Sequence, residues 1–164
     1  MSLEEARVIV VVYTAVLLPL IIYFFNKSKI PSWVPSFYII AVIVCALGWE
    51  IWFTFGWLDG DPVDIRRSAA LNTWLPKNIN WLMNSMGDAG AVLLGGFWLM
   101  WLTHNKDNSV FLEWKWSAFI VLLAWCIGQN ILVEMFLYHD QLAEGKPLSW
   151  APLSPLGPYF NPIL

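Results

Sequence analysis

Three carboxyl groups interrupt long apolar stretches of this chain, and they are the residues best suited to chemistry: Glu50, Asp88 and Glu134. An ionisable side chain in hydrocarbon costs roughly 2.5–3.5 kcal/mol or more, so each of these acids needs a reason to be there. No Lys or Arg lies within the same stretches to neutralise them. We therefore expect at least one carboxyl to hold a proton at neutral pH, which would make it a general acid in apolar surroundings.

The three acids are expected at similar depths. Glu50 lies eight residues before the expected end of its helix, Asp88 lies eight residues after the expected start of its own, and Glu134 lies four residues before a third helix ends. At about 1.5 Å per helical residue, all three fall roughly 6–12 Å inside the same face. We expect one shared cavity, in which Glu50 and Asp88 handle the proton and Glu134 tunes them.

Helical spacing adds polar neighbours to two of the acids, because residues four apart face the same way. Asn84 precedes Asp88 by four residues and Asn130 precedes Glu134 by four, so we expect both amides to hydrogen-bond within the site. Candidates for substrate binding are these amides and the residues that flank the acids: Trp49, Trp52, Asn84, Asn130, Tyr138 and His139. The alternative is structural, since amide side chains often join helices, and it applies to Asn80, Asn84 and Gln129.

Metal and cofactor chemistry is disfavoured. His104 and His139 are the only histidines and are expected at opposite membrane faces, which excludes a His-rich metal site. The run of Asp59, Asp61 and Asp64 lacks the ligand loop of a calcium site. The sequence contains no phosphate-binding glycine loop and no nucleophile elbow, and its net charge of -3 without a basic stripe argues against nucleic acid. We expect no metal and no cofactor.

The elements that must position these residues are membrane helices. The 164 residues are 59% hydrophobic and only 13% charged, and the twelve Trp favour the bilayer interface. Long apolar runs predict an all-α polytopic membrane protein, a four-transmembrane-helix bundle in one domain of residues 1–164, with spans at about 8–25, 36–58, 80–103 and 116–138.

Shorter features complete this prediction. A short interfacial helix is expected at residues 65–71, and the small residues Ala91 and Gly95 would let a neighbouring helix approach the third span closely. The tail, residues 139–164, is Pro-rich and is predicted to fold back as a lid. Four spans place both termini and loop two on one side. Loops one and three carry Lys27, Lys29, Lys106 and Lys115, which favours a cytoplasmic location for these loops.

The acid-lined four-helix arrangement resembles the emopamil-binding and sigma-2 receptor-like membrane family, on residues covering roughly half the chain: Gly48, Trp49, Glu50, Gly128, Gln129, Glu134, Tyr138 and His139. The resemblance implies a sterol isomerase-type reaction that protonates and deprotonates a lipid alkene. The isomerases have a His where Ala46 stands here, and a further membrane helix. The pair Trp49 and Glu50 is also similar to small integral membrane terpene cyclases, which start a carbocation cascade with an intramembrane acid.

The favoured hypothesis is a membrane-embedded acid/base enzyme, an isomerase or cyclase, or a binding protein for an apolar sterol- or isoprenoid-like lipid. The alternative is a non-catalytic accessory subunit or assembly factor of a larger membrane complex or homo-oligomer. A proton-coupled transporter is a third hypothesis. It is disfavoured because the loop-one half of each helix is almost purely apolar.

Overall fold

The computed structural model describes residues 1–28, 30–56 and 61–136, except the side chains of Glu4, Asn130 and residues 134–136. Helices are the only regular secondary structure in these ranges. Four of them are long and apolar enough to cross a membrane: Glu5–Asn26, Trp33–Phe55, Lys77–Thr103 and Trp116–Val133. The predicted all-helical chain with four helices of membrane-spanning length is therefore confirmed. The Pro-rich tail lies outside the described residues.

The first helix, α1 (Leu3–Asn26), begins earlier than its apolar run. Ser2 Oγ accepts a hydrogen bond from the Glu5 backbone N–H at 3.1 Å, and Glu5 Oε2 accepts one from the Ser2 backbone N–H at 2.6 Å. This capping box satisfies two N–H groups that the helix start would otherwise leave unpaired. The polar first turn therefore belongs to the helix, although hydrophobicity alone placed the start at residue 8.

The second long helix consists of α2 (Trp33–Cys45), η1 (Ala46–Glu50) and α3 (Ile51–Phe55). It starts three residues before the predicted Ser36, because Pro35 occupies the first turn, where a backbone N–H needs no partner. It ends at Gly56, whose φ of 80° requires a glycine. A Cβ at Gly56 would lie 2.4 Å from the Asp61 carbonyl carbon.

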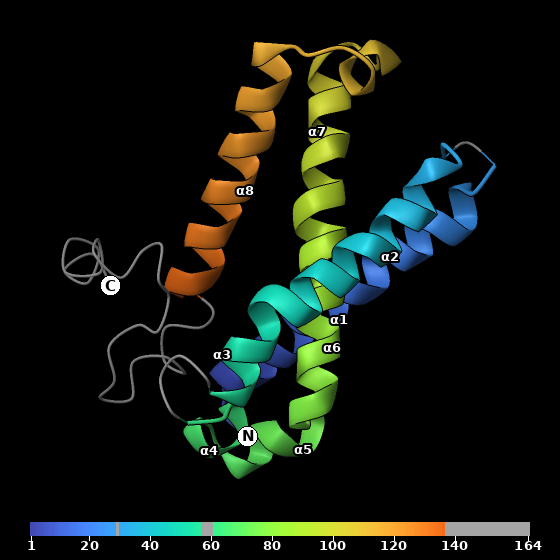
Figure 1. The fold of residues 1–164 in the computed structure, drawn as a ribbon. Coiled ribbons are helices and arrows are strands. Elements are labelled where there is room, and N and C mark those ends of the chain that lie inside the picture. Colours follow the sequence, from blue (N-terminus) through green and yellow to red (C-terminus); the bar gives the residue numbers. More distant parts are fainter. Residues whose placement is uncertain (29, 57–60, 137–164) are drawn as a thin grey trace.

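The third long helix is continuous through α6 (Lys77–Gly87), η2 (Asp88–Leu94) and α7 (Gly95–Thr103), and the fourth is α8 (Trp116–Phe136). Figure 1 shows the hairpin of α1 and α2 crossing the long third helix obliquely, while α8 stands beside α7. Among the described elements, α8 packs mainly against α7 and η2. The third helix is therefore the axis on which the other three are arranged.

The segment between the second and third long helices differs from its prediction. The single helix expected at residues 65–71 is wrong: two short helices, α4 (Val63–Arg66) and α5 (Ala69–Trp74), are separated by Arg67 and Ser68. Both residues have extended backbone, and Ser68 Oγ caps α5 by accepting from the Leu71 N–H at 3.2 Å. A Ser cap starts a new helix here instead of continuing the old one.

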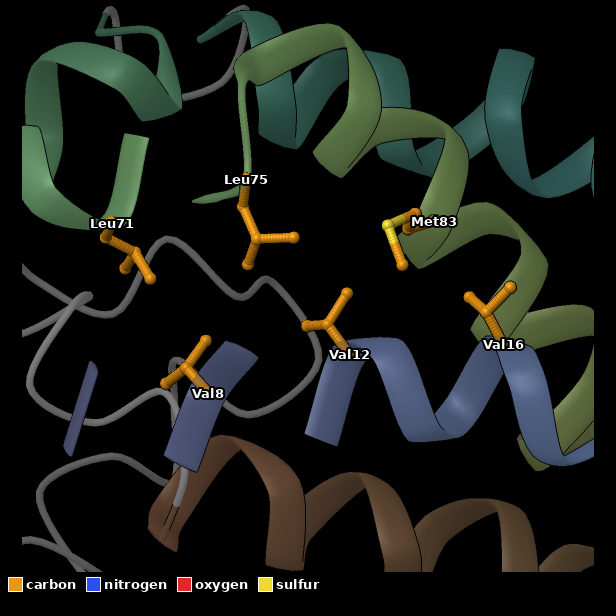
Figure 2. Close-up of a cluster of buried hydrophobic side chains, with 6 residues drawn as sticks. All are labelled: Val8, Val12, Val16, Leu71, Leu75 and Met83. Atoms are coloured by element: carbon orange, nitrogen blue, oxygen red, sulfur yellow. The ribbon is translucent and has the colours of Figure 1, made fainter. Parts of the chain in front are cut away.

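Packing of this segment on α1 forms the larger apolar core. Three α1 valines spaced four residues apart point toward side chains of α5, its following residue and α6 (Figure 2): Val8, Val12 and Val16 face Leu71, Leu75 and Met83. Ser68 Oγ also hydrogen-bonds Glu5, and Tyr13 Oη donates to the Trp74 carbonyl at 3.0 Å. The start of α1 and loop two therefore lie at the same end of the bundle.

At the opposite end, polar contacts organise the loop between α7 and α8, which contains η3 (Asn108–Phe111). His104 Nε2 lies 2.8 Å from Ser117 Oγ, and this contact joins the two helices. Asp107 accepts hydrogen bonds from the side chain and backbone of Ser109, and Lys115 Nζ lies 3.4 Å from its Oδ2. These contacts lower the pKa of the exposed Asp107 carboxyl to about 2.

Candidate functional site

Glu50 is buried more deeply than Asp88, the other predicted acid whose side chain the structure describes. It is the last residue of η1, and only 5% of its surface is exposed. The hydroxyl of Thr54, one turn later and fully buried, donates a long hydrogen bond of 3.5 Å to Glu50 Oε2. A carboxyl is thus held inside the bundle at the level where the second long helix packs on α6.

Asp88 is the first residue of η2 and is half-buried. Each acid-bearing segment packs against the helix of the other acid, because η1 contacts α6 and η2 contacts α2. Both carboxyl groups lie within electrostatic range of the thiol of Cys45, the last residue of α2. The two carboxyl groups therefore share one neighbourhood around Cys45.

Both acids lie in π-helical segments, which sequence periodicity did not predict. A π turn holds one residue more than an α turn, so the residues that follow are rotated by about 100° relative to an unbroken α-helix. Such segments occur frequently at functional sites. The five residues of η1 end on Glu50, so this segment affects where the Glu50 carboxyl points. The seven residues of η2 begin with Asp88, so η2 rotates the rest of the third helix relative to Asp88.

Tryptophan side chains from neighbouring helices bind a backbone carbonyl within each π segment. Trp81 Nε1, on α6, donates to the Ala46 carbonyl in η1 at 2.9 Å. Trp125 Nε1, on α8, donates to the Val92 carbonyl in η2, also at 2.9 Å. A π turn departs from the regular i to i−4 ladder, and a side-chain donor can satisfy a carbonyl that the altered turn presents.

Small residues bring the helices close on either side of η2. A Cβ at Gly90 would lie 3.0 Å from Pro19 Cγ, and a Cβ at Gly96 would lie 3.0 Å from Trp125 Cδ1. Gly95 also contacts the neighbouring helix α8, since a Cβ there would lie 3.4 Å from Trp125 Nε1, and the close approach at Ala91 stays a prediction.

Asn80 joins a polar cluster at the loop-two end of the bundle. Its Oδ1 accepts from Arg67 Nη1 at 3.0 Å, and both side chains are buried. Arg67 also donates to Asn72 Oδ1 at 2.6 Å and to the Leu75 carbonyl. The contacts of Asn80 therefore support its structural interpretation, and the cation involved, Arg67, comes from the segment between α4 and α5.

The aromatic and amide candidates divide by exposure. Trp49 and Asn84 are half-buried, whereas Trp52 is 44% exposed on α3. The Trp81 ring packs edge-on against Phe55 with centroids 6.1 Å apart, on the second long helix beside Glu50. Sequence reasoning missed Trp81 because its indole reaches the site from one helix away.

Candidates on the fourth helix are only partly described. Asn130 and Glu134 lie on α8, but their side chains are outside the described part of the chain. Tyr138 and His139 lie entirely outside the described residues. The meeting of Glu134 with the other two acids stays a prediction. Within the described residues, no group of three or more His, Cys, Asp or Glu is arranged to hold a metal ion.

Comparison with known proteins adds no assignment: no family model, no curated protein and no solved structure matches this chain. Glu50 and Asp88, with Cys45, Thr54 and Trp81 around them, are therefore the side chains from which a function must be inferred.

Proposed function

We propose that this chain is a multi-pass membrane protein whose four long helices span the bilayer. Large apolar side chains face outward along these helices, as lipid contact requires: Leu18, Ile40, Val44, Leu47, Trp98, Ile120 and Leu132 are each at least 50% exposed. In the same proposal, loops one and three face the cytoplasm. Labelling of single cysteines introduced into loop three, from outside intact cells, tests this orientation, and labelling there would reverse it.

Within the bilayer, we propose that Glu50 and Asp88 form an acid/base pair acting on an apolar lipid of sterol or isoprenoid type. The observation that carries this function is the placement of the two carboxyl groups in π segments of touching helices, with Cys45 near both. Two carboxyl groups in a region of low polarity share a proton, since like charges there repel strongly. One group can then donate a proton while the other accepts one.

This chemistry requires no redox partner. The protonated carboxyl gives its proton to one carbon of an alkene, leaving positive charge on the other, and the second carboxylate removes a proton from an adjacent carbon. The product is an isomer, or a cyclised isomer if another double bond attacks the cation first. Aromatic faces stabilise such a cation, and Trp49, Phe55 and Trp81 lie on the segments that surround Glu50.

Deuterium transfer from solvent tests this function before the substrate is known. The purified protein in liposomes would be incubated in D2O with an apolar lipid extract, and the lipids would be compared by mass spectrometry. We expect at least one sterol or isoprenoid lipid to gain carbon-bound deuterium in a time-dependent reaction. Absence of any enriched lipid with the active-site residues intact would overturn the catalytic proposal.

Matched carboxyl-to-amide variants assign the reaction to the site. Glu50→Gln and Asp88→Asn should each slow deuterium transfer by roughly 10²- to 10⁴-fold, because an amide cannot exchange the proton that a carboxyl provides. Glu113→Gln is the control, since Glu113 is exposed in the loop before α8. Equal transfer by the Glu50 and Glu113 variants would remove Glu50 from the mechanism.

A non-catalytic accessory subunit is the second candidate function, and α8 is the observation that favours it. This helix packs mainly on α7 and η2, and a Cβ at Gly128 would meet no atom within 4 Å. A small-residue position on an uncovered membrane helix suits contact with another helix. A partner subunit that copurifies in fixed ratio and is lost in Gly128→Leu, without deuterium transfer by the complex, would support this function over the first.

A further inference from the structure

The two acid-bearing π segments have a common feature that the catalytic proposal does not explain. Each binds a tryptophan indole from a helix that follows later in the chain, and each bond is 2.9 Å from Nε1 to the carbonyl oxygen. Trp81 reaches Ala46 across 35 positions and Trp125 reaches Val92 across 33. Neither bond is a local helix contact, so each fixes one helix relative to another.

Trp81 connects the two acids directly. It lies on α6, seven residues before Asp88, and its indole binds the carbonyl of Ala46, four residues before Glu50. Its ring also packs on Phe55. Any movement of Trp81 would therefore change the position of η1, and of Glu50 with it, relative to the helix that carries Asp88.

Trp125 acts on the second segment from α8. Its indole packs over Gly95, where a Cβ would lie 3.4 Å from Nε1, and over Gly96, where a Cβ would lie 3.0 Å from Cδ1. The absence of a side chain at Gly96 gives the indole its access to the Val92 carbonyl, whereas a Cβ at Gly95 would make only an ordinary contact with the ring. The hydrogen bond therefore depends on Gly96 as well as on Trp125 itself.

We propose that Trp81 and Trp125 are positioning residues, whose indole-to-carbonyl hydrogen bonds hold η1 and η2 in the π form and so set how Glu50 and Asp88 face each other. Without the indole donor, each carbonyl loses a hydrogen bond in an apolar region, and the Val92 carbonyl keeps the one from the Gly95 backbone N–H. The loss of this bond weakens the preference for the π form over the α form. A return to the α form changes the local turn by one residue, equivalent to about 100° of rotation. The role is independent of which lipid the site accepts, but its effect on turnover rests on the proposed acid/base function.

NMR of the full-length protein in nanodiscs tests the positioning role without an activity. Trp81→Phe and Trp125→Phe remove the donor and keep an aromatic ring, and Trp98→Phe is the control because Trp98 is 57% exposed on α7. We expect Trp81→Phe to shift the ¹³C signals of the Ala46 carbonyl and the Glu50 carboxyl, with the carboxyl assigned by its loss in Glu50→Gln. Trp125→Phe should shift the Val92 carbonyl and the Asp88 carboxyl, and the control should shift none of them.

Unchanged carboxyl signals in both donor-free variants would overturn the positioning role. If Trp→Phe prevents folding, benzothienylalanine at position 81 or 125 is the second variant, since it keeps the bicyclic shape and lacks the N–H. In the unmodified protein the Trp81 and Trp125 indole protons should exchange with D2O at least about tenfold more slowly than that of Trp114, which is 66% exposed in the loop before α8. Equal exchange of the three would contradict the hydrogen bonds themselves.

Turnover separates this inference from the catalytic one. Where deuterium transfer occurs, each Trp→Phe variant should lower kcat by roughly 10- to 100-fold with little change in KM, because the carboxyl groups are misplaced while the lipid still binds. Shifted carboxyl signals in a protein that transfers no deuterium would contradict the catalytic function and leave the positioning role standing. An active protein in which both Trp→Phe variants keep an unaltered kcat would overturn the positioning role and leave the catalytic function standing.

Discussion

Adjacent glycines on α7 should respond differently to the same substitution. A Cβ at Gly96 would lie 2.6 Å from Leu122 Cδ1 and 3.0 Å from Trp125 Cδ1, whereas a Cβ at Gly95 would come no closer than 3.4 Å to the Trp125 indole. Carbon atoms pack best at about 3.5–4.0 Å. Gly96→Ala therefore forces the flexible Leu122 to rotate and also moves the indole ring, while Gly95→Ala meets an ordinary contact.

The magnitudes follow from overpacking and helix propensity. We expect Gly96→Ala to lower the free energy of unfolding by about 1–3 kcal/mol, which is the usual cost of inserting a methyl group into a packed contact. Gly95→Ala should leave it within about 1 kcal/mol of the unsubstituted protein, since alanine favours a helix over glycine and nothing has to move. Both residues lie in α7, so the pair shares every other effect of the substitution.

Reversible unfolding by SDS in mixed micelles, followed by far-UV circular dichroism, measures both variants under identical conditions. The Trp125 indole N–H signal should also move in Gly96→Ala, because the displaced ring donates to the Val92 carbonyl less well. Equal destabilisation by the two substitutions would refute the described contact between α7 and α8. Greater destabilisation by Gly95→Ala would refute the finding that Gly96, and not Gly95, makes the closer contact with α8.

Three further outcomes follow from contacts at the two ends of the bundle. Arg67→Met should destabilise the protein by about 3 kcal/mol, because the buried guanidinium is 8% exposed and holds acceptors that would be left unpaired; the SDS titration measures this. The NMR shift of the Ser109 amide should titrate with a midpoint near 2, since the pKa of Asp107 is lowered to about 2; the contact is present above pH 4 and is lost as the pH falls toward 2. Gly56→Ala should cost about 2 kcal/mol or more, from its φ of 80° and the contact of 2.4 Å, as seen in the same SDS titration.

Each of these outcomes has its own control. Arg7→Met removes an exposed Arg from α1 and should change stability by less than about 0.5 kcal/mol, so similar losses for the two Arg variants would contradict the buried cluster. Asp107→Asn should abolish the low-pH titration, and a midpoint near 4 in the unsubstituted protein would contradict the Ser109 contacts. Gly48→Ala meets no atom within 4 Å, and a loss as large as that of Gly56→Ala would show that the turn is not the cause.

The four long helices could be predicted because each is coded by a local property. Apolar runs of about twenty residues determine a membrane-length helix wherever they occur, and tertiary contacts are not needed to recognise them. The helix ends were less predictable. The start of α1 depends on the pairing of Ser2 with Glu5, and the start of α2 depends on Pro35 falling in a first turn, and both are geometric details of a few residues.

The acids of the candidate site could be recognised in the sequence, but the helix geometry around them could not. Glu50 and Asp88 stand out because a carboxyl in an apolar run is costly wherever it points. The π segments that orient them have the composition of ordinary helix, and the donors that bind them come from Trp81 and Trp125, more than thirty positions away. Arg67 was likewise missed, because its burial arises from α5 and α6 folding over it and leaves no mark in the local sequence.

The pairing of Glu50 with Asp88 in one proton-transfer step is tested most directly by a double-mutant cycle of deuterium transfer. Rates would be measured for the unsubstituted protein, Glu50→Gln, Asp88→Asn and the double variant in the same liposomes. If the two carboxyl groups serve a single step, the double variant should be no slower than the slower single variant. Rate losses that multiply in the double variant, or two single variants that both keep full activity, would contradict a shared acid/base pair.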